Sequence, residues 1–191
     1  MTPRFFGYGS LVNLTTHDYP NAAPARLEGW RRIWRPTDIY AHSFLSAHRV
    51  EGAEIAGVVA DVPGADWAAL DAREWGYGRR DVTHLVRHEA GAGPVAVYEV
   101  EAPAGDALRP ILRSYLDVVV QGFLRVHGEE GAAHFFDTTD NWAVGLLDDR
   151  ADPKYPRARV LTSTESALVD RLLADHEVPE VRAEDLPGAT G

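Results

Sequence analysis

Two short stretches of the sequence carry residues that could do chemistry together. The first is Gly7-Tyr8-Gly9-Ser10, which follows Phe5-Phe6 and interrupts an apparent buried strand. Glycine offers a strand interior no side chain to pack and costs entropy, so bare backbone has a use here. Glycines flanking Tyr8 allow positive φ angles, and consecutive N–H groups in such a turn converge on an anion. The stretch predicts a site for a carboxylate or a developing oxyanion, with a tight turn as the plain alternative.

The second stretch places a glutamate on the buried face of a short helix. Trp67, Leu70 and Glu74 fall at positions i, i+3 and i+7 of that helix. Burial and the C-terminal end of the helix dipole both raise the pKa of a carboxyl group placed there. A raised pKa suits a general base that later returns its proton. The alternative is a glutamate at a frayed helix end that pairs with Arg73 or Arg79 at the surface.

The charge and composition exclude several classes of function. The net charge is −10, from 19 Lys+Arg against 29 Asp+Glu. Nucleic-acid binding depends on neutralising phosphates, so this balance argues against a nucleic-acid partner. Cysteine is absent, which removes disulfides and thiolate metal sites and fits a reducing compartment. No apolar run reaches the roughly 20 residues of a membrane helix, and no signal-peptide pattern opens the chain. We therefore expect no membrane partner and a cytoplasmic location.

An anionic small molecule is compatible with this charge if amides or arginines make its pocket positive. The arginines that are candidates for this role are Arg31, Arg32, Arg35, Arg79 and Arg80. For any one of them, a solvated surface position is the simpler interpretation.

The order of the predicted elements indicates an α+β fold. Strand patterns occupy 4–8, 27–34, 42–49, 54–62, 80–89 and 94–101, with a hairpin turn expected at 91–93. Helical patterns occupy 66–76, 108–127 and the segment after the Thr162-x-x-Glu165 capping box. Strands come first and are joined by short turns, and helices follow. This order favours a largely antiparallel sheet or barrel over a doubly wound parallel sheet.

We expect one domain over residues 1–178 and a weakly ordered tail over residues 179–191. The sequence contains no internal repeat and no linker that would divide the first range. The tail is rich in Glu, Pro, Gly and Ala, a composition that buries little apolar surface.

Four motifs occur in an order that is typical of one superfamily. They are FGYGSL at 6–11, GWRR at 29–32, GVVADVP at 57–63 and LDAREWGY at 70–77, with SYLDVVVQGF at 114–123 as a weaker block. YGSL followed by L-D-x-R-E-x-G-Y is more specific than either motif alone. In these motifs the sequence resembles the γ-glutamylcyclotransferase-like superfamily, including its ChaC-like branch that degrades glutathione.

This resemblance implies a compact, mixed, largely antiparallel β-barrel with peripheral helices, a glycine-rich binding loop and one catalytic glutamate. Carried over residue by residue, the substrate-binding residues are Tyr8, Gly9, Ser10, Leu11 and Tyr115, and the catalytic residue is Glu74. Tyr115 also lies on the apolar face of its helix, where a core aromatic is an equal interpretation.

The implied reaction is the intramolecular closure of a γ-glutamyl amide to 5-oxoproline, with release of the amine or peptide. The implied partner is a small-molecule γ-glutamyl substrate, and no metal or organic cofactor is required. Glutathione, γ-glutamyl amino acids and γ-glutamylamines all fit the same core. The oligomeric state is not defined by the sequence.

Two other functions would use the same pocket. Ser10 as a hydrolase nucleophile would require G-x-S-x-G, which the segment Gly9–Asn13 does not supply. A non-catalytic binder of γ-glutamyl or similar anionic small molecules would keep the loop. The presence of Glu74 argues against that binder, because binding a zwitterion does not require an extra buried carboxylate.

Histidines raise a third alternative, a metal site. His84 and His88 are four residues apart, and His42 and His48 are near each other in the chain. The first pair falls in a predicted strand, and no HExxH motif occurs. Surface or cross-strand histidines are the better interpretation.

Overall fold

The structure is a computed structural model that describes residues 1–38, 40–100 and 109–186. Its centre is a seven-stranded sheet in the order β4-β6-β1-β3-β2-β5, with β8 beside β2. The strands are β1 (Arg4–Gly7), β2 (Ala23–Arg35), β3 (Phe44–Asp61), β4 (Tyr77–Asp81), β5 (Val86–His88), β6 (Val95–Val100) and β8 (Thr139–Asp140). A separate pair joins β7 (Ile111–Leu112) to β9 (Leu146–Leu147).

Antiparallel pairing dominates the central sheet. β3 pairs antiparallel with both β1 and β2. β5 also pairs antiparallel with β2, and β6 pairs antiparallel with β4. The exceptions are parallel pairs of β1 with β6 and of β2 with β8. The predicted α+β class with a largely antiparallel sheet is confirmed. The predicted barrel is not, because among the described strands no pairing connects β4 with β5 or β8.

Three predictions about the strands are wrong. The expected strands 42–49 and 54–62 form one long strand, β3, because β2 pairs with both parts of it, at 44–49 and at 54–59. A bulge between Glu28 and Trp30 absorbs the irregularity in this pair. The expected strand 80–89 is divided into β4 and β5, which have different partners. For the same reason 91–93 is not a hairpin turn, since β5 and β6 do not pair.

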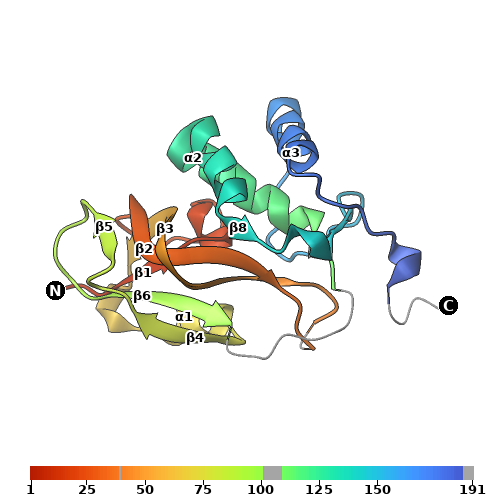
Figure 1. Cartoon of the computed structure of the whole chain (residues 1–191). Coiled ribbons are helices and arrows are strands. Elements are labelled where there is room, and N and C mark those ends of the chain that lie inside the picture. The colour runs from red at the N-terminus through yellow and green to blue at the C-terminus, as the bar shows by residue number, and fades with distance from the viewer. Residues whose placement is uncertain (39, 101–108, 187–191) are drawn as a thin grey trace.

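Helices cover both faces of the sheet (Figure 1). α2 (Arg113–Asp137) and α3 (Ser163–Asp175) lie on one side, and α1 (Ala68–Arg73) lies on the other side, beside β4. Successive side chains of β1 point to opposite faces of the sheet. Phe6 belongs to the larger core under α2, and Phe5 belongs to a smaller core with Leu70 of α1. The first strand therefore lies at the centre of the molecule.

The helix boundaries agree with the sequence in part. The capping box of α3 is confirmed, with both reciprocal hydrogen bonds between Thr162 and Glu165. α1 is shorter than expected, and Asp66 accepts a hydrogen bond from the Ala68 N–H without being the cap. α2 begins at Arg113, after β7, so Pro110 precedes the helix and does not lie in its first turn. Residue 108, the expected start, lies outside the described residues.

The C-terminal segment is attached to β9 by backbone hydrogen bonds. The Leu146 N–H donates to Pro179 O at 2.8 Å, and the Val181 N–H donates to Leu146 O at 2.8 Å. The last residues, 187–191, lie outside the described part, and the domain boundary at residue 178 stays a prediction.

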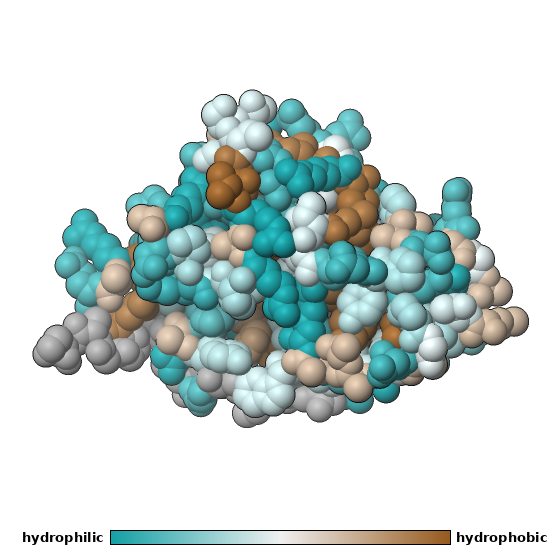
Figure 2. Space-filling view, turned by 180° about the vertical axis from the view of Figure 1, so that it is seen from behind, coloured by the Kyte–Doolittle hydropathy of each residue, from teal (hydrophilic) through white to brown (hydrophobic). Residues whose placement is uncertain are grey.

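The face opposite that of Figure 1 is mostly hydrophilic, with hydrophobic residues in separate groups (Figure 2). Within the described residues, no helix combines the length and apolar character needed to cross a membrane.

Candidate active site

Glu74 ends α1 and faces a pocket. It is the C-cap residue of the helix, and its N–H donates to Leu70 O at 2.9 Å. Its side chain is only 17 % exposed. Leu70 on the same helix face is fully buried, and Trp67 packs against the same small core. The spacing of these three residues thus identified the inward face of α1.

The charge of Glu74 is set by burial and by two arginines. Burial raises the pKa of Glu74, while the guanidinium groups of Arg73 and, more weakly, Arg157 oppose that rise. Arg73 Nε lies 3.3 Å from Glu74 Oε1, and both side chains are largely buried. The alternative of a surface pair is therefore wrong, because the Arg73 pair is buried and Arg79 pairs with Asp71 at 2.9 Å instead. A carboxylate in this environment takes up a proton more readily than an ordinary glutamate.

The glycines of the first loop are explained by close contacts. A Cβ atom at Gly9 would lie 2.8 Å from Tyr115 Oη, and one at Gly7 would lie 2.7 Å from Leu11 Cβ. Neither glycine has a positive φ; that of Gly9 is −126°. The expectation of a positive-φ turn is wrong. Bare backbone is needed here because α2 and the loop itself approach too closely for side chains.

The loop leaves backbone amides available at the pocket. A 3-10 turn over Ser10–Val12 begins with the hydrogen bonds from Val12 N–H to Gly9 O and from Asn13 N–H to Ser10 O. The amides of Gly9 and Leu11 take no part in those bonds, whereas the Ser10 amide interacts with the Tyr115 hydroxyl. The side chain of Leu11 is buried in the smaller core, so only its backbone can reach a ligand.

A buried arginine, Arg32, binds the backbone at the start of this loop. Arg32 is fully buried, and its Nε donates to Tyr8 O at 3.0 Å. Its guanidinium also lies over the rings of Phe123 and Phe135. Arg32 therefore fixes the Tyr8 carbonyl at the start of the loop.

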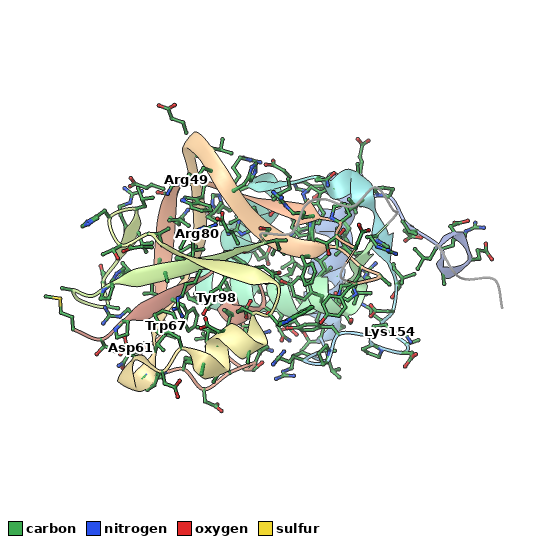
Figure 3. All side chains as sticks on the ribbon, turned by 90° about the horizontal axis from the view of Figure 1, so that it is seen from below. Arg49, Asp61, Trp67, Arg80, Tyr98 and Lys154 are labelled. Carbon is green, nitrogen blue, oxygen red and sulfur yellow. The ribbon has the colours of Figure 1, made fainter. Side chains whose placement is uncertain are left out.

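Four tyrosines line the same pocket, and burial raises the pKa of Tyr8, Tyr77, Tyr98 and Tyr115. All four hydroxyls therefore stay protonated near neutral pH. Tyr8 donates to Tyr98 O at 2.5 Å, and Tyr77 donates to Leu45 O at 3.0 Å. Tyr98, which lies beside α1 (Figure 3), donates to Asp71 of that helix. These bonds fix the walls of the pocket.

Two connected cavities meet at Glu74. The inner pocket, of about 30 Å³, is lined by all six residues predicted from the sequence: Tyr8, Gly9, Ser10, Leu11, Glu74 and Tyr115. The outer cleft, of about 340 Å³, shares Ser10, Glu74 and Tyr115 with it. The structure thus brings the predicted residues together, while the role of each stays a prediction.

The arginines that line the site are not the five that the sequence offered as positive charges for the pocket. Arg31, Arg32, Arg35, Arg79 and Arg80 line neither cavity. Arg73 and Arg157 do line the outer cleft. Arg73 is adjacent to Glu74 in the LDAREWGY motif, which was a usable signal, and it also donates to Thr16 O at 2.9 Å. No local pattern distinguishes Arg157.

The segment that carries Tyr155 and Arg157 is attached to the start of α2. Buried Asp149 accepts hydrogen bonds from Ser114 N–H at 2.7 Å and from Lys154 N–H at 2.8 Å. The Tyr155 N–H donates to Ser114 Oγ, and the Tyr155 ring meets that of Tyr115 with centroids 5.0 Å apart. These contacts place the segment on the wall of the outer cleft.

The histidines do not form a cluster. Across the part of the chain that the structure describes, no group of three or more His, Cys, Asp or Glu side chains could hold a metal ion. His48 pairs with Asp140 at 3.0 Å, and His42 lines the outer cleft.

Comparison with known proteins gives matches in structure only. No protein-family model matches the chain, and a search of curated proteins gives no significant match. A solved structure named γ-glutamyl cyclotransferase aligns over 88 % of this chain and 98 % of its own, with a TM-score of 0.56 and 16 % identity. The uncharacterised human protein LOC79017 aligns over 87 % and 97 %, with a TM-score of 0.52 and 17 % identity.

YkqA from Bacillus subtilis also matches, with a TM-score of 0.56 and 16 % identity over 73 % of this chain and 56 % of its own. Identities this low show the fold alone. The chain has the fold of the solved γ-glutamyl cyclotransferase, as the resemblance indicated by its sequence motifs predicts.

Proposed function

We propose that this protein closes a γ-glutamyl amide or peptide to 5-oxoproline and releases the amine, with Glu74 as general base and then general acid. The observation that carries the proposal is the meeting of a largely buried carboxylate with the glycine-rich first loop in one pocket. A structurally similar protein that is named γ-glutamyl cyclotransferase supports the same reaction class.

The substrate supplies its own nucleophile in this reaction. The α-amine of a γ-glutamyl group can reach its own γ-carbonyl carbon to close a five-membered ring, and intramolecular attack has a large effective molarity. The amine is an ammonium group near neutral pH and must first lose a proton. The raised pKa of Glu74 suits its carboxylate to accept that proton.

Closure then proceeds through a tetrahedral intermediate. The new C–N bond puts negative charge on the γ-carbonyl oxygen, and the amides of Gly9, Ser10 and Leu11 are suited to stabilise it or to hold the α-carboxylate. Glu74 then gives its proton to the departing nitrogen as the old amide bond breaks, and the second proton that the ring nitrogen loses passes through the freed carboxylate to the released amine. No water is consumed, and the proton returns from Glu74 to the products, so the carboxylate is regenerated.

The experiment is a panel of γ-glutamyl compounds incubated with the folded protein: glutathione, γ-glutamyl-alanine and γ-glutamyl-ε-lysine. We expect stoichiometric release of 5-oxoproline and of the matching amine from at least one member. Binding of panel members without any release would instead favour the non-catalytic binder.

A further inference from the structure

The outer cleft has an aromatic wall that the proposed chemistry does not use. Tyr40 and Trp75 are 45 % and 60 % exposed, which is unusual for side chains of this size. Their ring centroids lie 6.0 Å apart, and Tyr40 lies 5.3 Å from Phe44. Phe44 in turn meets Tyr77, which lines both cavities, at 5.5 Å. A continuous aromatic surface therefore extends from the rim of the cleft to the inner pocket.

This surface is suited to an apolar, flat group. Exposed rings that contact one another edge to face offer both faces and edges to a further ring. A polar or small leaving group would gain little from covering them. Because they lie directly outside the pocket that holds Glu74, a substrate whose reacting amide lies at Glu74 would extend its leaving group over these rings.

Arg157 adds a cation to the same cleft. Its guanidinium forms no hydrogen bond and no close ion pair with any described residue. Neighbouring Arg73 differs, because it is paired with Glu74 and donates to Thr16 and Ser10. Arg157 is therefore the arginine of this cleft that is available to a ligand carboxylate.

The charges around the cleft favour an anionic ligand. Glu74 is offset by Arg73, Arg157 adds one positive charge, and burial lowers the pKa of His42, which keeps its ring neutral at neutral pH. A γ-glutamyl amino acid carries one ammonium and two carboxylates, so its net charge is the opposite of that of the cleft. A lysine-type leaving group would bring a further cation toward Arg157.

We propose that the outer cleft is a leaving-group subsite for γ-glutamyl derivatives of aromatic amino acids, with the ring on the Tyr40–Phe44–Trp75 surface and the second carboxylate on Arg157. This inference rests on the proposed function and narrows its substrate class.

The test is calorimetric titration of Glu74→Gln, which keeps the pocket shape, with three probes. They are γ-glutamyl-phenylalanine, γ-glutamyl-alanine, which lacks the ring, and γ-glutamyl-phenethylamide, which lacks only the second carboxylate. We expect the phenylalanine compound to bind about tenfold more tightly than either of the others. Equal binding of the phenylalanine and alanine compounds would overturn the subsite.

Variants assign the selectivity to residues. In the Glu74→Gln background, Trp75→Ala should remove most of the preference for phenylalanine over alanine. Arg157→Gln should remove the difference between phenylalanine and phenethylamide. The matched controls are Val160→Ala and Arg182→Gln, two exposed positions outside the cleft, which should leave both ratios unchanged. Selectivity that survives both cleft variants would also overturn the assignment.

Release of 5-oxoproline from the same probes by the wild-type protein separates the two proposals. Selective binding without release overturns the proposed function and keeps the subsite. Release without selectivity overturns the subsite and keeps the function. Absence of binding for every probe overturns both.

Discussion

The inner pocket and the outer cleft meet at Glu74, yet they are built in different ways. The inner pocket consists of backbone and of side chains fixed on the sheet, where Gly9 has no space for a Cβ atom and the Tyr8 hydroxyl is bound to a carbonyl. The outer cleft adds side chains from loops to those on helices and strands, among them Trp75 at 60 % exposure. A rigid site suits the reacting atoms, and a wall of exposed side chains suits selection among leaving groups.

The largest loss of activity is expected from a substitution of Glu74, where the inner pocket and the outer cleft meet. Glu74→Gln keeps the shape of the side chain and removes the base, so kcat should fall by about 10²–10⁴-fold with little change in KM. Steady-state kinetics of 5-oxoproline release measure this change. Glu129→Gln, at an exposed position on α2, is the matched control and should retain full activity. Wild-type turnover by Glu74→Gln would exclude the proposed role of Glu74.

The next largest loss of activity is expected from adding a side chain at Gly9, where Tyr115 and Leu45 leave no space for a Cβ atom. Gly9→Ala places a methyl group 2.8 Å from Tyr115 Oη and 3.2 Å from Leu45 Cδ2, so the loop amides must shift and kcat/KM should fall by about 100-fold. The φ of Gly9 is −126°, so the substitution does not require alanine to adopt a positive φ.

A second substitution isolates that contact. Tyr115→Phe removes the oxygen atom that the new methyl group meets, so the double variant should have a higher Tm than Gly9→Ala alone. If Gly9→Ala has wild-type stability and activity, the explanation of this glycine by close contact is wrong.

A smaller effect is expected on the pH profile. The charge of Arg157 lowers the pKa of Glu74 against the rise caused by burial, so Arg157→Gln should raise that pKa further. Because the base must be ionised in the free enzyme, the acidic limb of kcat/KM should move to higher pH. Arg73→Gln should move the limb farther, since Arg73 is the larger influence. A limb that moves to lower pH in either variant would contradict this electrostatic account.

The smallest effect is expected on folding stability at the rim of the cleft. Trp75→Ala should change the free energy of unfolding by less than about 0.5 kcal/mol, because the side chain is largely exposed. Trp34→Ala, at a fully buried tryptophan of the larger core, should cost about 3–5 kcal/mol. Chemical denaturation of both variants measures the contrast. A large loss for Trp75→Ala would mean that this residue supports the fold, which its exposure does not indicate.

Local sequence patterns predicted the inner pocket better than the outer cleft. The spacing of Trp67, Leu70 and Glu74 identified a helix face because such a face depends on nearby residues only. The capping box of α3 was predictable for the same reason. The glycines of the first loop were recognised as unusual, but Gly9 is explained by a contact with Tyr115 of a distant helix and Gly7 by a contact with Leu11.

Other features depend on contacts between distant segments. Tyr40, Trp75 and Arg157 come together only in the folded chain, so no spacing could group them. β3 was divided in the prediction because Gly and polar residues bound the two expected strands, whereas β2 pairs with β3 on both sides of 50–53 and joins the two parts. The closed barrel was implied by resemblance and is not confirmed, since register and closure of a sheet depend on pairing that local sequence does not encode.

The central claim is that the α-amine of the substrate, and not water, attacks the γ-carbonyl carbon. Mass spectrometry of the products formed in heavy-oxygen water tests this directly. The account predicts 5-oxoproline without label from water, together with the free amine. Glutamate carrying one labelled oxygen would show hydrolysis instead and would contradict the account.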